Sequence, residues 1–318
     1  MITLYGADPN GKGGIATYAN TLLKHLPNSA CVPYKKIEFV RNGKRHFGYI
    51  SNFAFQFTYN IKSDIIHSLS SANFHYKSNV STIHDLFFDS KNYERSVKLF
   101  LSPAIIKWKL GKLKIIFVSK LGQNQFKQIY HSIKDTYVIP MGIDFNYIDS
   151  LKFINPFTTE NNIVFAGGVD FKRRNQEYII KKLLNTDYNL YIVGYGLVDI
   201  LKEKYKKYTN MHFVKSPSDS EFYSYLNYSD LNVYNTVGEG FGYIIYESLY
   251  LGKKMLINEN EDNILLFDDY VDYYTDKNFY SKIEDNLDKH VNKREKLLDQ
   301  FSVKKMIEKT LDVYSTVR

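Results

Sequence analysis

Short apolar runs typical of β-strands alternate with helix-length segments along this chain, and the alternation occurs twice. In the first half the apolar runs lie at residues 2–5, 64–67, 80–83, 115–118 and 137–139. In the second half they lie at residues 163–166, 190–193, 212–214, 231–234 and 255–257. Strands that alternate with helices favour a parallel sheet covered by helices. Because 318 residues also exceed the usual length of one domain, we expect two consecutive α/β domains.

Helical periodicity is clearest at residues 91–110, 120–131 and 291–316. The last of these segments carries an apolar stripe and is predicted to form one long helix. Between the two halves the periodicity weakens from Pro140 to Pro156, which indicates a linker.

Positive charge is concentrated in the first half of the chain. Residues 1–156 carry 20 Lys and Arg against 9 Asp and Glu, a net charge of +11, whereas the whole chain has a net charge of +8. This asymmetry indicates an anionic partner such as acidic lipid, a phosphate-bearing acceptor or nucleic acid. A lysine-rich solvated surface explains it equally well. Trp108, which lies among lysines, fits a lipid interface or a core with a basic rim, and its irregular spacing favours the core.

The most informative segment follows the apolar run at 231–234 and reads Gly-Glu-Gly-Phe-Gly-Tyr-Ile-Ile-Tyr-Glu from 238 to 247. A glycine-rich turn that leads into a helix presents backbone N–H groups at the positive end of the helix dipole, which suits phosphate. Glu239 and Glu247 add carboxylates that can each accept hydrogen bonds from a vicinal diol, on a hexose or a ribose. Their alternative role is favourable charge near a helix N-terminus and on a solvated helix face.

This segment resembles the donor-site motif of the retaining glycosyltransferases of family four, which have the two-domain GT-B fold. Five further segments fall in the family's order: Gly-Gly-Ile at 13–15, Thr-Ile-His-Asp-Leu at 82–86, Ile-Phe-Val-Ser at 116–119, Val-Ile-Pro-Met-Gly-Ile-Asp at 138–144, and Val-Phe-Ala-Gly at 164–167. Each match is short, but their order and spacing extend the resemblance from residue 13 to about residue 257. The resemblance implies two Rossmann-like domains facing each other across a cleft.

By this resemblance, the motif residues bind a nucleotide-sugar donor. Glu247 would hold the ribose hydroxyls, and Glu239 would contact the transferred sugar. Backbone groups of Gly240, Phe241 and Gly242 would lie against the sugar and the phosphates.

Gly13, Gly14 and His84 are the candidates in the first half. Residues without a Cβ let the backbone approach the donor diphosphate at the head of a helix, although Gly-Gly is in general more often a simple turn. The family places a histidine at the position of His84, where it contacts the transferring sugar; a lone histidine after an apolar run is otherwise more often structural. His67 is interpreted as a structural histidine.

A departing diphosphate needs a cation because negative charge grows on it as its bond to the sugar breaks. The run Lys-Arg-Arg at 172–174 follows the apolar strand that ends in Gly167 and is the natural source. The family usually has an arginine directly after this glycine, but this chain has Gly168 there. Lys172 and Arg173 are therefore expected to replace that arginine jointly. Their alternative role is a solvated basic turn.

The predicted organisation has four parts. Residues 1–145 form an N-terminal Rossmann-like domain on the acceptor side, and 146–157 form the linker. Residues 158–300 form a C-terminal Rossmann-like domain that binds the nucleotide sugar. Residues 301–318 form a helix that packs back toward the N-terminal domain, as the resemblance implies.

The predicted function is transfer of a hexose-type sugar from a nucleotide diphosphate donor to an acceptor hydroxyl, with retention of anomeric configuration. The acceptor is a glycan, a lipid-linked sugar or another hydroxyl compound. No metal or other cofactor is expected, because no Asp-X-Asp pair stands at a strand end beside the motif. Two alternatives remain: a nucleotide-sugar epimerase or phosphorylase of the same fold, and a basic nucleic-acid-binding α/β protein. The second has no recognisable binding motif, so we expect no nucleic acid partner.

The sequence indicates a cytoplasmic protein. Cys31 is the only cysteine, and the chain begins without the basic and apolar pattern of a signal peptide. No apolar stretch is long enough to span a bilayer. Any membrane contact is expected to be peripheral, through the basic half at the inner face of an acidic membrane.

Overall fold

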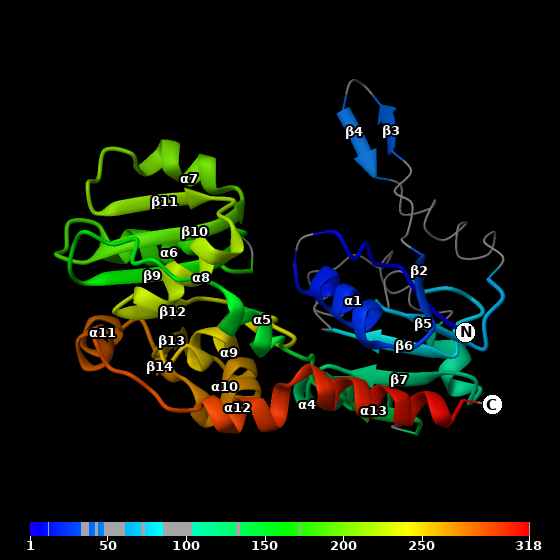
Figure 1. Ribbon diagram of the computed structural model, residues 1–318. Helices are drawn as coiled ribbons and strands as arrows, with labels where there is room; N and C mark the ends of the chain where they lie inside the picture. The colour runs from blue at the N-terminus through cyan, green and yellow to red at the C-terminus, as the bar shows by residue number, and fades with distance from the viewer. Residues whose placement is uncertain are drawn as a thin grey trace. The chain divides into compact units, whose positions relative to one another are not determined.

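The computed structural model describes residues 1–318 except for 12, 33–37, 42–43, 48–60, 71–73, 85–103, 132–133, 172 and 318. It divides into two compact units: unit 1 comprises Met1–Gly142 and Val303–Arg318, and unit 2 comprises Ile143–Ser302. Each unit contains a six-stranded sheet (Figure 1). The strand pairs within both sheets are parallel, which confirms the prediction of two α/β domains.

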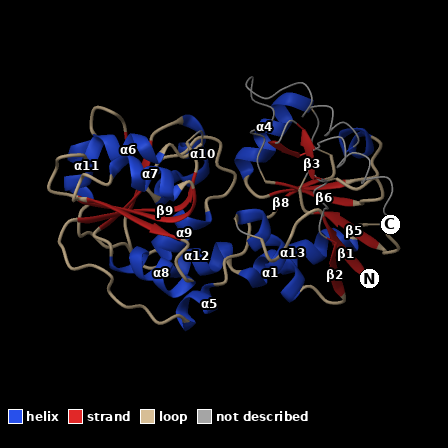
Figure 2. Cartoon of the chain, turned by 90° about the horizontal axis from the view of Figure 1, so that it is seen from above, coloured by secondary structure: helices blue, strands red, loops and turns tan. Residues whose placement is uncertain are grey.

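Unit 1 has the strand order β2-β1-β5-β6-β7-β8. These strands are β1 (Ile2–Tyr5), β2 (Ser29–Val32), β5 (Ile65–Ser68), β6 (Val80–Ile83), β7 (Lys114–Phe117) and β8 (Thr136–Val138). A separate antiparallel pair consists of β3 (Glu38–Arg41) and β4 (Lys44–Phe47). The named helices are α1 (Gly14–His25), α4 (Lys120–Tyr130) and α13 (Val303–Ser315). Figure 2 shows α4 on one face of the sheet and α1 and α13 on the other.

Unit 2 has the strand order β11-β10-β9-β12-β13-β14. These strands are β9 (Asn162–Val169), β10 (Asn189–Gly196), β11 (Met211–Lys215), β12 (Leu231–Tyr234), β13 (Met255–Asn258) and β14 (Asp272–Tyr274). The helices are α5 (Phe145–Ser150), α6 (Gln176–Leu183), α7 (Val198–Tyr205), α8 (Asp219–Tyr228), α9 (Tyr243–Tyr250), α10 (Glu261–Phe267), η3 (Asp268–Tyr270), α11 (Phe279–Asn286) and α12 (Arg294–Phe301). The central strand β9 is buried along almost its whole length, as expected for a parallel strand covered on both faces (Figure 2).

The strand order of each sheet reverses at one point. In unit 1 the reversal lies between β1 and β5, and in unit 2 it lies between β9 and β12. In open α/β sheets, the loops at the carboxyl ends of the strands diverge at such a point and leave a crevice that accepts ligands. The loops expected to bind ligands are therefore those that follow β1 and β5 in unit 1, and β9 and β12 in unit 2.

The chain passes between the units twice, and the packing around each passage is tight. In unit 1, a Cβ at Gly142 would lie only 2.7 Å from the Cα of Val303, so only glycine fits. In unit 2, Ile143 forms a parallel bridge with Ser302, and its N–H donates to the Phe301 carbonyl at 2.7 Å. The passage at 142/143 precedes the predicted linker at 146–157, which begins within α5 and belongs to unit 2.

The C-terminal segment is two helices rather than the single long one predicted over 291–316. Ser302 has an extended backbone, with φ −67° and ψ 148°, and ends α12. The helix α13 then belongs to unit 1, where the Tyr314 hydroxyl is hydrogen-bonded to His67 Nδ1 at 2.7 Å. His67 is fully buried and has the structural role predicted for it.

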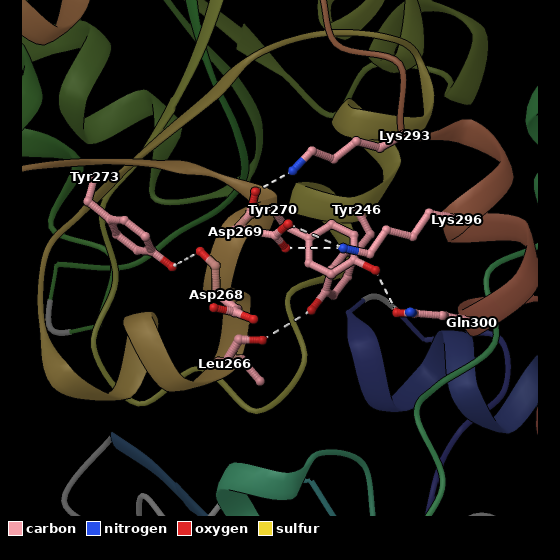
Figure 3. A network of polar contacts seen from close by, with 9 residues as sticks. All are labelled: Tyr246, Leu266, Asp268, Asp269, Tyr270, Tyr273, Lys293, Lys296 and Gln300. Atoms are coloured by element: carbon pink, nitrogen blue, oxygen red, sulfur yellow. Dashed lines mark hydrogen bonds and ion pairs between the residues drawn. The ribbon is translucent and has the colours of Figure 1, made fainter.

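Polar and aromatic contacts fix α12 to the rest of unit 2 (Figure 3). Lys296 on α12 pairs with the exposed Asp269 at 3.1 Å, and its ammonium lies 4.3 Å from the centroid of the Tyr270 ring. The Tyr270 hydroxyl donates to Gln300 Oε1 at 2.5 Å. At the end of α12, Phe301 packs against Phe241 with ring centroids 5.5 Å apart. The motif turn thus rests on the helix that leads to the second passage.

Trp108 belongs to the core of unit 1. It is 4% exposed and packs edge-on against Phe126, with ring centroids 5.0 Å apart. Its Nε1 donates to the Lys134 carbonyl at 2.8 Å. Of the two roles considered for this residue, the structure therefore supports core packing.

Candidate functional site

Two loops meet at the carboxyl edge of the unit 2 sheet, where the strand order reverses. One loop follows β9 and carries Arg173; the other follows β12 and carries Gly238. Arg173 Nη2 donates to the Gly238 carbonyl at 2.7 Å, and the Val237 N–H donates to the Arg173 carbonyl at 2.9 Å. Arg173 therefore joins the basic loop to the glutamate motif.

Arg174 lies deeper than its neighbour. Its Nη1 donates to the Gly168 carbonyl at 3.0 Å, and its guanidinium lies 5.5 Å from the centroid of the Tyr234 ring. Burial lowers the pKa of Arg174, but Tyr234, Glu239 and Tyr195 together raise it by more than burial lowers it. The net shift of the pKa is therefore upward. The guanidinium is thus a permanent positive charge next to Glu239.

Glu239 is partly buried, and its Oε2 is a buried acceptor without a hydrogen-bond partner among the described residues. The buried Tyr234 hydroxyl and Thr236 Oγ1 are in the same state within that part of the chain. Buried polar atoms normally have partners, because an unmade hydrogen bond there is unfavourable. Three such atoms beside the reversal point have the properties of a site that receives polar ligand groups.

The turn after Glu239 places backbone rather than side chain toward the edge of the sheet. Phe241 is 2% exposed, so its ring is part of the core and only its main chain is available to a ligand. Gly242 caps α9 with φ +83°, and a Cβ there would lie 2.8 Å from the Phe267 ring. A left-handed conformation without space for a side chain explains the glycine. In the described part of the chain, no side chain caps the N-terminus of α9.

Glu247 lies within α9 and contacts α8. The Tyr223 hydroxyl donates a hydrogen bond to its carboxylate, and Asp219 lies nearby. Burial raises the pKa of Glu247 to about 7; the Tyr223 hydrogen bond opposes the rise and Asp219 adds to it. Tyr223 is a functional candidate that the sequence gives no signal for, because it stands on a different helix from the motif.

Unit 1 carries the other predicted residues: the two glycines follow β1 at its reversal point, and His84 follows the next strand beyond it, β6. Gly13 has φ +102° and precedes α1, whose first turn contains Gly14 and is capped by no side chain of the residues that the structure describes. His84 directly follows β6, and its Nε2–H donates to the carbonyl of Leu69, directly after β5, at 2.8 Å. Burial lowers the pKa of His84 to about 4, so the imidazole is neutral at physiological pH. The Tyr18 ring meets it edge-on, with centroids 5.2 Å apart.

The structure therefore gathers the predicted residues into two groups. Arg173, Glu239, Gly240, Phe241, Gly242 and Glu247 belong to unit 2, and Gly13, Gly14 and His84 belong to unit 1. Lys172 lies outside the described residues. Within the described part of the chain, no group of three or more His, Cys, Asp or Glu is arranged to hold a metal ion. No helix among the same residues has both the length and the apolar character needed to cross a membrane.

Comparison with solved structures identifies the fold. HepE of Anabaena in complex with UDP-glucose superimposes with a TM-score of 0.72 at 14% identity, over 99% of this chain and 100% of that one. Sucrose-phosphate synthase of Thermosynechococcus elongatus gives a TM-score of 0.69 at 14% identity, over 99% and 98% of the two chains. WaaG, a glycosyltransferase involved in lipopolysaccharide biosynthesis, gives 0.59 at 12% identity, over 100% and 95%.

These likenesses show that the chain has the GT-B fold, as the sequence motifs predicted. No protein-family model matches the sequence, and no curated protein is similar enough to match it.

Proposed function

We propose that this protein is a retaining glycosyltransferase that moves a hexose-type sugar from a nucleotide diphosphate donor to an acceptor hydroxyl. The observation that carries the proposal is the edge of the unit 2 sheet, where Arg174 lies beside Glu239 and the Glu239 Oε2 has no partner among the described residues. A cation and an unpaired acceptor at a strand-order reversal suit a ligand with both phosphates and hydroxyls. The similarity to HepE in complex with UDP-glucose supports the same conclusion.

In the proposed complex, unit 2 holds the donor. Glu247 accepts hydrogen bonds from the ribose hydroxyls, and Glu239 accepts them from the transferred sugar. The backbone of Gly240, Phe241 and Gly242 lies against the sugar and the phosphates. This arrangement is supported by the buried Phe241 ring and by the start of α9, which no described side chain caps; both leave main-chain groups as the contact surface.

The proposed reaction breaks the bond between the anomeric carbon and a phosphate oxygen, and the electron pair leaves with the diphosphate. The acceptor oxygen forms its bond to the anomeric carbon on the same face, and its proton passes to the departing phosphate. The products are the glycoside and the nucleoside diphosphate. Cationic side chains and the start of α9 stabilise the charge that grows on the leaving group, so the proposal requires no metal.

Unit 1 is proposed to serve the acceptor and the reacting end of the donor. Gly13 and Gly14 bring backbone N–H groups to the diphosphate, and the neutral imidazole of His84 contacts the transferring sugar. The net charge of +11 on residues 1–156, of which 1–142 belong to unit 1, supports a phosphate-bearing or lipid-linked acceptor and a peripheral contact with acidic membrane.

The proposal is tested with a thermal-shift panel of UDP, GDP, ADP and their glucose conjugates. A ligand at 100 times its Kd stabilises the folded protein by about 2.7 kcal/mol, which is a measurable rise in Tm. The stabilising donor, labelled in its sugar, is then incubated with candidate acceptors and the anomeric configuration of the product is determined by NMR. Turnover without a sugar acceptor would instead identify an epimerase or a phosphorylase. Absence of a shift with every nucleotide, combined with salt-sensitive binding of RNA or DNA, would replace the proposal with nucleic-acid binding.

A further inference from the structure

The space beside Gly168 is filled by an arginine from elsewhere in the chain. A Cβ built on Gly168 would lie 3.0 Å from Arg174 Nη1 and 3.0 Å from Tyr195 Cε2. A Cβ on Gly167 would lie 3.3 Å from the same Arg174 nitrogen. The guanidinium of Arg174 therefore occupies the space into which a side chain at residue 168 would extend.

Arg174 is held at this position from several sides. Its Nη1 donates to the Gly168 carbonyl, Tyr195 is hydrogen-bonded to its side chain, and Tyr234 lies beneath its guanidinium. Its own carbonyl accepts from Asn235 Nδ2 at 2.9 Å, which fixes the backbone. The side chain nevertheless retains partial exposure. A guanidinium anchored in this way is preorganised and needs no rearrangement to bind an anion.

The two arginines of the loop have different environments. Arg173 donates to the Gly238 carbonyl and so joins the loops that follow β9 and β12. Arg174 lies at the end of β9 next to the buried Tyr234 hydroxyl, which has no partner among the described residues, and next to Glu239. The geometry therefore separates a residue that positions the motif from a residue that faces its unpaired polar atoms.

We propose that Arg174 is the catalytic cation of this site: its guanidinium binds the donor diphosphate and stabilises the charge on that group as it leaves. Arg173 is a positioning residue that holds the Gly238–Glu239 turn. This assignment rests on the proposed function, and it differs from the expectation that Lys172 and Arg173 carry the role. It also explains how the chain functions with glycine at 168, because the guanidinium arrives from residue 174 instead.

The first test measures the binding of UDP, GDP and ADP to the full chain by calorimetry. Arg174→Gln removes the charge but keeps an amide donor for the Gly168 carbonyl. We expect this variant to bind the nucleoside diphosphate roughly ten- to a hundredfold more weakly than wild type does, as for a lost charge-assisted hydrogen bond. Binding of the corresponding nucleoside, followed by NMR titration, should change less than threefold. Lys254→Gln is the matched control. Lys254 directly precedes β13, so it lies at the amino ends of the strands, away from the site at their carboxyl ends, and it pairs with Asp272.

The second test moves the guanidinium back to residue 168. Gly168→Arg alone should lower Tm, because its Cβ meets Arg174 and Tyr195. Arg174→Ala should weaken diphosphate binding, and Gly168→Arg added to Arg174→Ala should restore at least tenfold of the lost affinity. Loss in one variant and recovery in the pair cannot arise from a merely structural role for Arg174.

The outcomes are distinct. A folded Arg174→Gln variant that binds the diphosphate within threefold of wild type overturns the assignment, and so does a folded double variant that recovers nothing. If wild type binds none of the three diphosphates, the proposed function itself fails and the assignment fails with it. If Lys254→Gln weakens binding as much as Arg174→Gln, the effect is one of net charge and the assignment is likewise overturned.

Discussion

Tyr223 on α8 donates a hydrogen bond to Glu247 on α9, so the carboxylate assigned to the donor ribose already has one partner before any ligand arrives. This contact fixes the direction of the carboxylate and opposes part of the rise in its pKa caused by burial. The remaining upward shift leaves Glu247 with a pKa of about 7. A buried carboxyl group with a raised pKa lowers the stability of the folded chain at alkaline pH, because it must ionise there without water.

The first prediction is that Glu247→Gln stabilises the protein at alkaline pH. Between pH 4.5 and about 7 the folded chain keeps the Glu247 proton and the unfolded chain releases it, so the free energy of unfolding falls as pH rises through this range. Glutamine removes this dependence and still accepts from Tyr223. The gain should reach at most about 3 kcal/mol at pH 8 and vanish near pH 4.5. Urea unfolding at the two pH values measures it.

An exposed glutamate provides the control for this prediction. Glu203 on α7 is 75% exposed and pairs with Lys206. Glu203→Gln should change the stability little at either pH, because exposed ion pairs contribute little. A gain for Glu247→Gln that is equal at both pH values would contradict the assignment of the raised pKa.

The second prediction separates the two motif glutamates. Glu247→Gln should lower the affinity for the bare nucleoside diphosphate by roughly ten- to a hundredfold, because the ribose hydroxyls lose a charged acceptor. Glu239→Gln should bind the nucleotide nearly as wild type does, whereas kcat/KM for transfer should fall sharply. Calorimetry with the nucleotide and initial rates with the sugar donor measure the pair. Equal loss of nucleotide affinity in both variants would show that the roles are wrongly divided.

The third prediction concerns divalent metal. Because the proposal assigns the leaving-group charge to arginine and to the start of α9, transfer should continue in excess EDTA at a rate close to the untreated one. The measurement is the initial rate before and after chelation, with Mg²⁺ or Mn²⁺ added back. Complete loss in EDTA with recovery on addition of either ion would remove the electrostatic role proposed for Arg174.

The fourth prediction is that two histidines make unit 1 sensitive to acid. Burial lowers the pKa of His67 to about 3, with a contribution from His84, whose own pKa falls to about 4. Below the ordinary value of 6.5 the unfolded chain binds protons at these residues and the folded chain does not, so stability falls as pH falls. Each histidine should cost about 2 kcal/mol by about pH 5.

The variant His67→Gln tests this prediction. It should lower stability at pH 7.5, because Thr82 and Tyr314 lose their ring partner, and it should flatten the decline toward acid. His25→Gln, at an exposed position on α1, should leave the stability at pH 7.5 nearly unchanged, because this ring is not part of the core. The same acid slope in His67→Gln as in wild type would contradict the assigned shift.

Most buried strands were predictable from sequence, because a strand covered on both faces is a nearly continuous apolar run. Two strands carry no such signal and were not predicted: β2 (Ser29–Val32), which is partly exposed at a sheet edge, and β14 (Asp272–Tyr274), where polar residues interrupt the run. The antiparallel pair β3 and β4 was not predicted either. The break at Ser302 was not predicted either. The apolar stripe continues through Phe301 and Met306, although the first residue packs in unit 2 and the second in unit 1.

The candidate site was predictable only where residue type and order carry the signal. Glu239 and Glu247 stand in a recognisable motif, and His84 stands at a strand end. The displacement of a guanidinium from 168 to 174 depends on how a loop folds back on β9, which no spacing reports. Tyr223 contacts Glu247 only because α8 packs against the unit 2 sheet. This contact could not be predicted from the sequence either.

The double passage at Gly142/Ile143 and Ser302/Val303 has a consequence for synthesis of the chain. Unit 2 is one uninterrupted segment, and its ends meet in the bridge between Ile143 and Ser302. Unit 1 lacks α13, and with it the Tyr314 partner of His67, until the residues after 302 have been made. Because domains generally fold as units as they emerge from the ribosome, unit 2 should reach its native packing first although unit 1 begins earlier. Folding of unit 2 then brings together Gly142 and Val303, the two residues at which the chain of unit 1 is interrupted.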